Sequence, residues 1–334
     1  MSVEPEISFC LPVYNSAERI ERCLRAVLEQ DVASREILVV DNASTDDTVA
    51  RARALLAGIP EARVVVNERN LGRIENWNRC LELAQGRYLR FAMVNDAWLP
   101  GSAEMLWREA QARPEAVMVY ARARFVQGTE AVAEPAPAHP PAQVFTSAEI
   151  IAHWCEIGHN DTDSLNTVLM RRDVIQRAGL RFRTDIPYWS DFYLIIELAA
   201  HGPVVYVPAE SYLFFKALPG RFANAGLKPQ PYYLDVRECS KLLGKLMAGH
   251  GRENWRGFGL LYYQYANHRV NFGNDVPLPG YRDTLALFKG SGPYWAKALK
   301  ERAGRCGYDF RLWWWQMLQR IAIKCGWGRR AARS

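Results

Sequence analysis

The sequence predicts an α/β fold with a doubly wound, mostly parallel sheet. Two observations predict it: short apolar runs rich in branched residues alternate with segments of helical spacing, and two of these runs end on a lone carboxylate, Asp41 and Asp96. In open parallel sheets, ligands bind beyond the carboxyl ends of the strands. We therefore expect the functional site at that edge of the sheet.

Strands and helices are expected to follow one another through the first hundred residues. Strands are predicted at 7–13, 37–40, 64–66 and 88–95, and helices lie between them at 20–28, 49–56 and 74–84. Gly86 is placed to cap the last of these helices.

The second part of the chain is less regular. Further strands are predicted at 116–121, 168–170 and 204–208. The Pro/Ala-rich segment around 130–143 predicts a mobile loop over 128–146. A helix with apolar spacing follows Phe192, so Asp191 lies at or just before its start. Residues 230–296 are helical in composition and carry no motif.

Composition and charge narrow the class of protein. The 334 residues are 49% hydrophobic and 23% charged, as in folded globular proteins. The seven cysteines have no metal-ligand spacing, which favours reduced thiols in a cytosolic protein. We expect no signal peptide and no spanning helix. The net charge is +6, yet residues 297–334 hold ten Lys/Arg against Glu301 and Asp309, a net of +8.

The basic tail predicts an anionic partner. Trp313, Trp314 and Trp315 lie among arginines and lysines between residues 308 and 330. Such an amphipathic helix is typical of a membrane surface, although a helix packed on the body with a solvated basic face fits the same pattern. A nucleic-acid role is not expected, because no recognition module accompanies the charge.

The strand ends exclude some nucleotide sites and leave others open. There is no Gly-x-Gly-x-x-Gly after the first strand and no P-loop motif. Asp41, before a Ser/Thr/Asn-rich loop, is placed to accept hydrogen bonds from a nucleobase or ribose. Asp96 is either a metal ligand or a cap of the helix that opens near Gly101.

Several motifs together carry a resemblance to a known family. They are Pro12-Val13-Tyr14-Asn15, Val39 through Asp46, Asn70-Leu71-Gly72 through Asn76-Trp77-Asn78, and Gly86-Arg87-Tyr88 leading into the acid. In this order and spacing the chain resembles family 2 glycosyltransferases, which have the GT-A fold, use nucleotide sugars and invert the anomeric configuration.

The resemblance implies donor-binding residues and a catalytic domain over 1–228. Within that domain, 1–100 would bind the nucleotide sugar and 101–228 the acceptor, followed by a helical region over 229–334. The implied donor-binding residues are Pro12, Tyr14, Asn15 and Asp41 at the nucleobase, Asn70, Asn78 and Asn95 near the ribose and diphosphate, and Arg73 at the phosphates. Arg73 could equally be a solvated arginine at a helix start.

The resemblance also implies a metal and a base. Asn95-Asp96 stands where the family has an acidic pair or cluster, which leaves Asp96 as the ligand of Mn²⁺ or Mg²⁺. Asp191 matches the family's general base, although an Asp there could also be an N-cap. Lys216 and Arg221 are candidates for contact with the diphosphate.

The expected function is a non-processive, inverting transfer of a sugar from a UDP sugar to a hydroxyl of a glycan. Processive relatives carry a Gln-x-x-Arg-Trp motif and spanning helices, and neither is expected here. The basic tail favours a lipid-linked acceptor at the inner face of a membrane, as in surface polysaccharide assembly. Two alternatives stay open, a nucleotide-sugar-binding protein without turnover and a nucleotidyltransferase.

Overall fold

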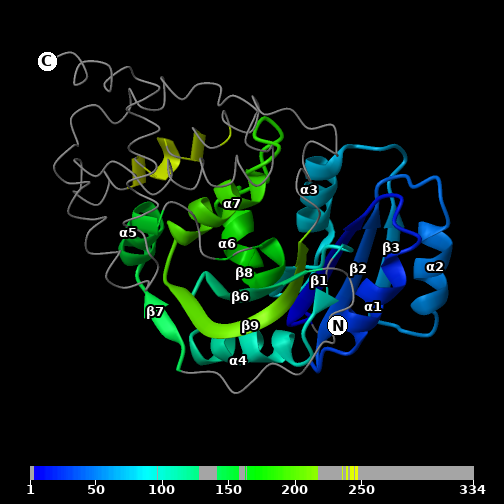
Figure 1. The fold of residues 1–334 in the computed structure, drawn as a ribbon, viewed down its shortest axis with the longest axis horizontal. Coiled ribbons are helices and arrows are strands. Elements are labelled where there is room, and N and C mark those ends of the chain that lie inside the picture. Colours follow the sequence, from blue (N-terminus) through cyan, green and yellow to red (C-terminus); the bar gives the residue numbers. More distant parts are fainter. Residues whose placement is uncertain are drawn as a thin grey trace, which may run out of the picture. The chain divides into compact units, whose positions relative to one another are not determined.

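The fold is that of the computed structural model, and the residues it describes are 4–95, 97–127, 141–157, 162, 164–216, 235, 238–239, 241–243 and 245–246. A mixed sheet runs through the whole of this part, with strand order β3-β2-β1-β4-β8-β6-β9-β5, and β7 pairs with β9 (Figure 1). This confirms the predicted α/β class.

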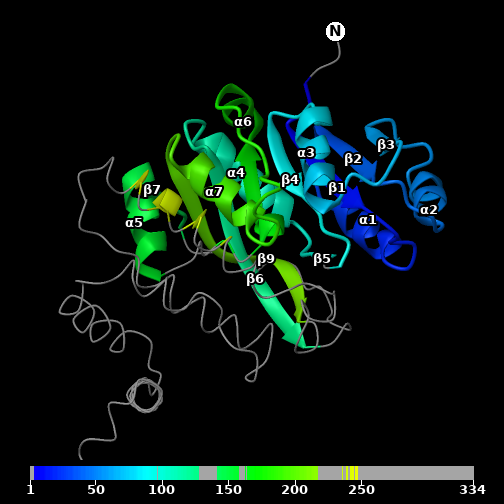
Figure 2. The same cartoon turned by 90° about the horizontal axis from the view of Figure 1, so that it is seen from above.

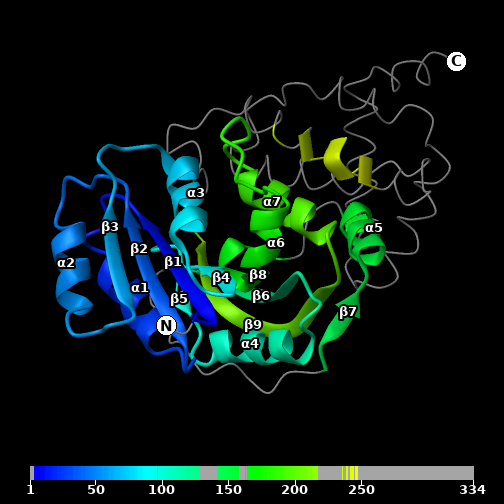
Figure 3. The same ribbon diagram turned by 180° about the vertical axis from the view of Figure 1, so that it is seen from behind.

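The first half is built from parallel strands separated by helices. Its elements are β1 (Ile7–Val13), α1 (Ile20–Leu28), β2 (Arg35–Asp41), α2 (Thr48–Leu55), β3 (Ala62–Val66), α3 (Arg73–Leu83) and β4 (Tyr88–Phe91). All strand pairs here are parallel: β1 with β2, β2 with β3, and β1 with β4. Figure 3 shows β3, β2 and β1 side by side in this order.

The second half mixes parallel and antiparallel pairs. Its elements are β5 (Ala97–Trp98), α4 (Ser102–Ala112), β6 (Met118–Gln127), β7 (Gln143–Phe145), α5 (Ser147–Ile157), the 3₁₀ turn η1 (Leu165–Thr167), β8 (Val168–Arg171), α6 (Arg172–Arg177), α7 (Ser190–Ala199) and β9 (Val204–Lys216). β8 is antiparallel to both β4 and β6, while the long strands β6 and β9 run parallel, side by side over most of their length (Figure 2).

Period-two alternation in the strands sends side chains to two cores. Leu38 and Leu89 lie in the core that includes α3, α5 and α7, whereas Ile37 and Tyr88 lie in the core that includes α1, α2 and α4. The sheet is therefore covered on both faces, which explains why its central strands are apolar throughout.

Two expectations from the sequence change in the structure. α3 ends at Leu83 with Ala84 as its C-cap, so Gly86 does not cap it. Gly86 instead packs against β1, where a Cβ would lie 2.5 Å from the main-chain nitrogen of Ser8. Part of the expected loop over 128–146 is also ordered, because residues 143–145 form β7, and residues 128–140 lie outside the described part.

The tail over 308–330 and most of 229–334 also lie outside the described residues. Within the part of the chain that is described, no helix combines the length and the apolar character needed to span a bilayer.

Candidate active site

The carboxyl ends of β1, β2 and β3 meet at one edge of the sheet. Val13 pairs with Asp41, and Asp41 pairs with Val66, so the last residues of the three strands stand in one row. The chain leaves this row through three loops that precede α1, α2 and α3. This is the edge at which open α/β sheets bind ligands.

The first two loops have backbone strain at matching places. Asn15, two residues after β1, has a φ of 44°, and Ala43, two residues after β2, has a φ of 60°. Left-handed backbone is unfavourable for alanine and persists where the surroundings hold it, often at functional sites. Side chains hold it here: the Asn15 N–H donates to Ser44 Oγ at 2.8 Å, and the Thr45 N–H donates to Asn15 Oδ1 at 2.9 Å.

Asp41 anchors this pair of loops. Its side chain is buried, Oδ2 accepts the Ser44 N–H at 2.8 Å, and Oδ1 accepts the Ser44 hydroxyl at 2.5 Å. A carboxylate oxygen has two acceptor positions, so each oxygen keeps capacity for a further donor. Because Ser44 in turn receives the Asn15 N–H, the acid fixes both loops at once.

A second acid fixes the entry to α1. Asp46 Oδ2 accepts the Ala17 N–H at 3.1 Å, and Oδ1 accepts the Thr48 N–H at 3.0 Å and the Thr48 hydroxyl. Burial raises the pKa of Asp46, but the hydrogen bonds from Thr48 and Ala17 outweigh it and bring the pKa below its usual value. The carboxylate is therefore held in its charged form.

Four asparagines join the third loop to the sheet. Asn42 donates to Asn70 Oδ1 at 2.8 Å, and Asn67 donates to Asn42 Oδ1 at 3.2 Å and to Asn76 Oδ1 at 2.8 Å. Asn70 Oδ1 also accepts the Gly72 N–H at 2.8 Å. Asn42, Asn67 and Asn76 are buried, whereas Asn70 is exposed at the edge. The network gives the loop before α3 a fixed shape.

Pro12 and Tyr14 take different positions at the end of β1. Pro12 is buried inside the strand opposite Val40, so it shapes the strand end rather than facing solvent. Tyr14 is 45% exposed, an unusual exposure for a large ring, and Leu71 of the third loop is 37% exposed. These apolar groups are available to a flat ligand at the edge.

Arg73 and Asn78 both lie on α3 but face different partners. Arg73 starts the helix, stacks over the Trp77 ring at 5.0 Å and donates to the Pro187 carbonyl. Asn78 is buried, donates to the Phe182 carbonyl at 2.9 Å and accepts the Phe182 N–H at 2.9 Å. Asn78 was expected to contact the nucleotide-sugar donor. Its side-chain nitrogen and oxygen instead both form hydrogen bonds with the main chain of Phe182.

Asp191 is the second residue of α7, with Trp189 at the N-cap position. It is therefore not the N-cap, and its Oδ1 accepts the Phe192 N–H at 2.9 Å. Burial raises the pKa of Asp191 above its usual value, although the Phe192 N–H and the charge of Arg73 act in the opposite direction. A carboxylate with raised proton affinity is suited to general base catalysis.

Asp235, an acid near Asp191, was not predicted as a site residue from the sequence. Asp235 Oδ2 accepts the Tyr188 N–H at 2.6 Å and the Trp189 N–H at 3.3 Å. Burial raises the pKa of Asp235 to about 7. Asp235 stands in a segment without a motif, and the only signal was a lone acid in a region of helical composition.

The residues expected around the metal and diphosphate are only partly described. Asn95 is exposed, and its carbonyl accepts from Arg22 Nη2 at 3.0 Å. Lys216 is the last residue of β9, with only its backbone described, and Asp96 and Arg221 lie outside the described residues. Over the described ranges, no group of three or more His, Cys, Asp or Glu side chains is arranged to hold a metal. The residues described therefore do not make a cation site by themselves.

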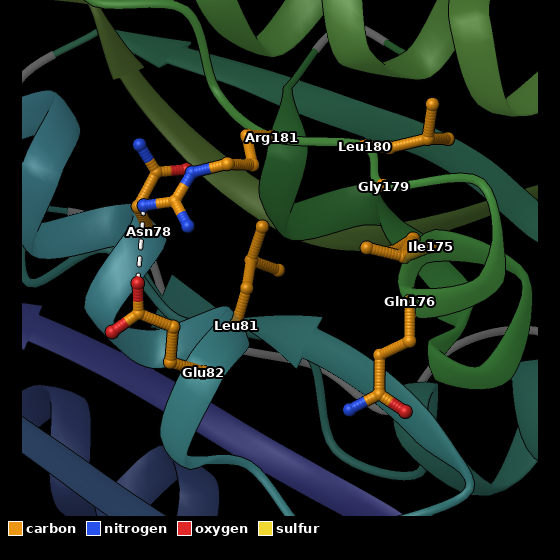
Figure 4. A pocket seen from close by; sticks show the side chains of 8 residues that line it. All are labelled: Asn78, Leu81, Glu82, Ile175, Gln176, Gly179, Leu180 and Arg181. Atoms are coloured by element: carbon orange, nitrogen blue, oxygen red, sulfur yellow. Dashed lines mark hydrogen bonds and ion pairs between the residues drawn. The ribbon is translucent and has the colours of Figure 1, made fainter.

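A separate cavity of about 270 Å³ lies between α3 and α6 (Figure 4). It is lined by Asn78, Leu81, Glu82, Ile175, Gln176, Gly179, Leu180 and Arg181. Arg181 and Glu82 form an ion pair there at 3.0 Å. The cavity contains none of the acids at the sheet edge, so we do not assign it to the candidate active site.

The sequence is similar to a known protein family and to several known proteins. The family described as Glycosyl transferase family 2 matches residues 8–155. The uncharacterized protein MT1568 of Mycobacterium tuberculosis is 33% identical over 62% of this chain and 66% of its own length. The uncharacterized glycosyltransferase YibD of Escherichia coli is 22% identical over 95% of both chains. WfgD of Escherichia coli, named as a UDP-Glc:α-D-GlcNAc-diphosphoundecaprenol β-1,3-glucosyltransferase, is 31% identical over 30% of this chain and 38% of its own.

Solved structures share the fold. Residues 1–349 of S. aureus TarS in complex with UDP-GlcNAc superpose with a TM-score of 0.59 at 16% identity, covering 89% of this chain and 80% of that one. The mannosyltransferase PcManGT of Pyrobaculum calidifontis, in complex with GDP-Man and Mn²⁺, gives a TM-score of 0.52 at 19% identity and covers 100% of this chain and 89% of that one. Residues 8–155, from β1 into α5, match glycosyl transferase family 2, and the solved structures show that the chain shares the GT-A fold of these enzymes.

Proposed function

We propose that the protein transfers one sugar, with inversion, from a UDP sugar to a hydroxyl of a glycan acceptor, and that Asp191 is the general base. Asp191 takes the proton of the acceptor hydroxyl as its oxygen attacks the anomeric carbon. The bond from that carbon to the diphosphate breaks, and the electron pair leaves with the nucleoside diphosphate. The observation that carries the proposal is the place of Asp191, half-buried in the first turn of α7 with its Oδ1 bonded to the Phe192 N–H, in surroundings that raise its pKa.

The donor's nucleotide is proposed to bind at the ends of β1, β2 and β3. Tyr14 offers an exposed ring for the base, and Asp41 and Asn15 are held by Ser44 in positions that leave acceptor capacity. Asn70 and Asn95 are exposed at the same edge, within reach of a ribose. Arg73 supplies positive charge for the diphosphate. The choice of uridine is supported by the names of WfgD and of the TarS complex.

Asp96 is proposed to hold Mn²⁺ or Mg²⁺ together with oxygens of the diphosphate, because hard cations prefer carboxylate and phosphate oxygens. Such a cation would offset negative charge on the departing diphosphate. Mn²⁺ is present in the PcManGT complex, which has the same fold. Lys216 and Arg221 are proposed to contribute positive charge to the binding of the diphosphate.

The acceptor is proposed to be a lipid-linked glycan, met at a membrane surface through the basic tail over 308–330. The name of WfgD specifies a diphosphoundecaprenol-linked acceptor. The tail's excess of positive charge favours an anionic bilayer surface.

The test is release of nucleoside diphosphate. Purified protein with Mn²⁺ is given UDP-GlcNAc, UDP-glucose or GDP-mannose in turn, with water as the default acceptor, and UDP or GDP release is followed. We expect release from a UDP sugar, and a fall of at least about 100-fold in Asp191→Asn, since a general base contributes 10²–10⁴-fold. Asp173→Asn, a partly exposed acid at the start of α6, is the matched control and should keep its rate. A wild-type rate that survives in Asp191→Asn would remove the proposed base.

A further inference from the structure

The turn formed by Tyr188 and Trp189 leads into α7 and determines where Asp191 lies. Tyr188 and Trp189 immediately precede the helix, and the Trp189 carbonyl accepts the Tyr193 N–H at 2.8 Å as the first bond of the helix. N–H groups at a helix start have no acceptor within the helix and need one from elsewhere. Both N–H groups are met by a single oxygen, Asp235 Oδ2, at 2.6 Å and 3.3 Å.

Asp235 is itself held by the core. Asp235, Cys239 and Leu243 are spaced by four residues on helical backbone and are 1%, 0% and 1% exposed. Cys239 and Leu243 share a buried cluster with Trp189 and Phe192. Cys239 Sγ also lies 4.0 Å from the Trp189 carbonyl oxygen. One buried helical face thus covers the residue before α7 and the residue after Asp191.

The charged groups around Asp235 also act on Asp191. Burial raises the pKa of Asp235 and the charge of Asp185 raises it further, while the Tyr188 and Trp189 N–H groups and the charge of Arg73 lower it. Arg73 is also the cation that lowers the pKa of Asp191. Burial and the charges of both acids raise the pKa of the Cys239 thiol, which keeps it neutral. The positive charge of Arg73 thus favours the charged form of both carboxyl groups.

We propose that Asp235 is a positioning residue, which fixes the turn before α7 and so sets the place of Asp191. The proposal deepens the proposed function, because it acts through Asp191 as the base. It assigns a role to the helical region after β9, for which the sequence indicated none. Asp235 does not touch the reacting atoms, and its effect is carried by the Tyr188–Trp189 turn.

The clamp itself is tested by hydrogen exchange on the full chain. In Asp235→Ala the amides of the segment 186–192 should exchange at least about tenfold faster than in wild type, because two hydrogen bonds to the turn are lost. Asp235→Asn keeps an acceptor oxygen and should restore most of the protection. Glu238→Gln, on the same helical segment and paired with Lys241, is the control and should match wild type. Unchanged exchange in Asp235→Ala would overturn the proposal.

The effect on the base is tested by titration and by rate. Carboxyl ¹³C shifts of labelled aspartates, assigned with Asp191→Asn, should give a lower pKa for Asp191 in Asp235→Ala, because a released turn exposes the Asp191 carboxyl to water and weakens the burial that raises its pKa. For UDP release from UDP-GlcNAc with Mn²⁺, the acid limb of the pH profile should move to lower pH in Asp235→Ala and stay near that of wild type in Asp235→Asn. In Asp235→Ala, kcat should fall about tenfold or more with KM within about twofold, since a misplaced base slows the chemical step and leaves donor binding intact.

A purely structural role has a different signature. It would lower the melting temperature of the Asp235 variants and leave the Asp191 titration and the pH profile where they are in wild type, which overturns the proposal. If wild type releases no nucleotide from any donor, the proposed function fails, and exchange and titration still decide whether Asp235 positions Asp191. If Asp235→Ala does not fold, Asp235→Ser, which also lacks the carboxyl group, takes its place in the exchange and titration experiments.

Discussion

The acids of the site differ in what surrounds their oxygens. Both oxygens of Asp41 accept from Ser44, so this carboxylate is fixed and holds the loops around it. Asp191 is half-buried and accepts the Phe192 N–H, and burial raises its pKa. Fixed acceptors suit binding, and a carboxylate with raised proton affinity suits proton transfer. The same residue type is thereby divided between two tasks.

Replacing Asp41 should weaken nucleotide binding. Asp41→Asn removes one charged acceptor from Ser44, which releases the loops after β1 and β2. We expect the Kd for UDP to rise at least about tenfold, since losing a hydrogen bond to a charged group costs about 1.5–3 kcal/mol. Isothermal titration with UDP and Mn²⁺ measures it. Asp47→Asn, exposed in the same loop and without a side-chain cap bond, is the control. Equal affinities in the two variants would contradict this role of Asp41.

Because of Asp235, the free energy of unfolding should decrease as the pH rises, whereas a carboxyl group with a lowered pKa has the opposite effect. Its folded pKa of about 7 lies above the unfolded value of about 4, so the folded state keeps a proton that the unfolded state has lost. This part of the stability is present below pH 4 and disappears as the pH rises to about 7. Asp235→Asn should remove that loss, so its Tm relative to wild type rises from pH 4 to pH 8 in thermal unfolding scans.

Asp173 provides a control of opposite sign. The hydrogen bond from Arg171 lowers the pKa of Asp173, so its contribution is present above pH 4 and is lost as the pH falls. Asp173→Asn should therefore lose Tm relative to wild type as the pH rises from about 2 to 5, and the difference should stay level from pH 5 to pH 8. Parallel curves for the two variants would contradict the assignment of Asp235.

At the scale of elements, β1, β2 and β3 were predicted well from the sequence, whereas the strand predicted at 88–95 is shorter, because β4 ends at Phe91. Apolar runs and their turns placed β1, β2 and β3 within two residues at each end. The start of α7 beside Asp191 also followed from helical spacing. These features are local, because they depend on period and turn residues within a few positions.

The contacts that cross between elements were not predictable. Asn78 was expected at the donor and instead pairs with Phe182, far along the chain, and Gly86 serves close packing on Ser8 rather than a helix end. Asp235 had no local signal. Which distant main chain meets a given side chain depends on tertiary packing, and one sequence alone carries no record of it.

One buried cation ties β4 to its neighbours. Arg90 is fully buried, donates to the Asn166 carbonyl at 3.1 Å and to Ser102 Oγ at 3.1 Å, and stacks over Trp98 at 4.1 Å. Among the described residues no carboxylate pairs with it, and burial lowers the pKa of Arg90 to about 9. The guanidinium therefore joins β4, η1, α4 and β5 through neutral partners.

Arg90→Met should destabilise the fold although it removes a buried charge. The buried Asn166 carbonyl loses its Arg90 donor, at a cost of about 1–3 kcal/mol for a group left unsatisfied, while Ser102 Oγ keeps its hydrogen bond to Gln30. We expect the free energy of unfolding in urea to fall by about 2 kcal/mol. Arg53→Met, exposed on α2, should be neutral. A more stable Arg90→Met protein would mean that desolvation of the charge outweighs its hydrogen bonds.

At the scale of the whole molecule, charge separates the tail from the body. Residues 297–334 carry a net of +8 and the rest of the chain −2. The full chain should float with vesicles containing anionic lipid and less so at high salt, because surface attraction is screened. A chain ending at residue 307 should stay in solution, and neutral vesicles serve as the control. Equal flotation of both chains would remove the proposed role of the tail.

The partners of α3 bear on how enzymes of this kind can be recombined. Although α3 belongs to the first hundred residues, Arg73 reaches Pro187, Asn78 pairs with Phe182, and Glu82 meets Arg181. A chimera that exchanges residues 1–100 alone would place these three side chains against a segment that comes from the other parent enzyme. One that also carries 178–189 keeps them. The part that can be exchanged between such enzymes therefore includes α3 together with the segment that α3 contacts, and this part is discontinuous in the sequence.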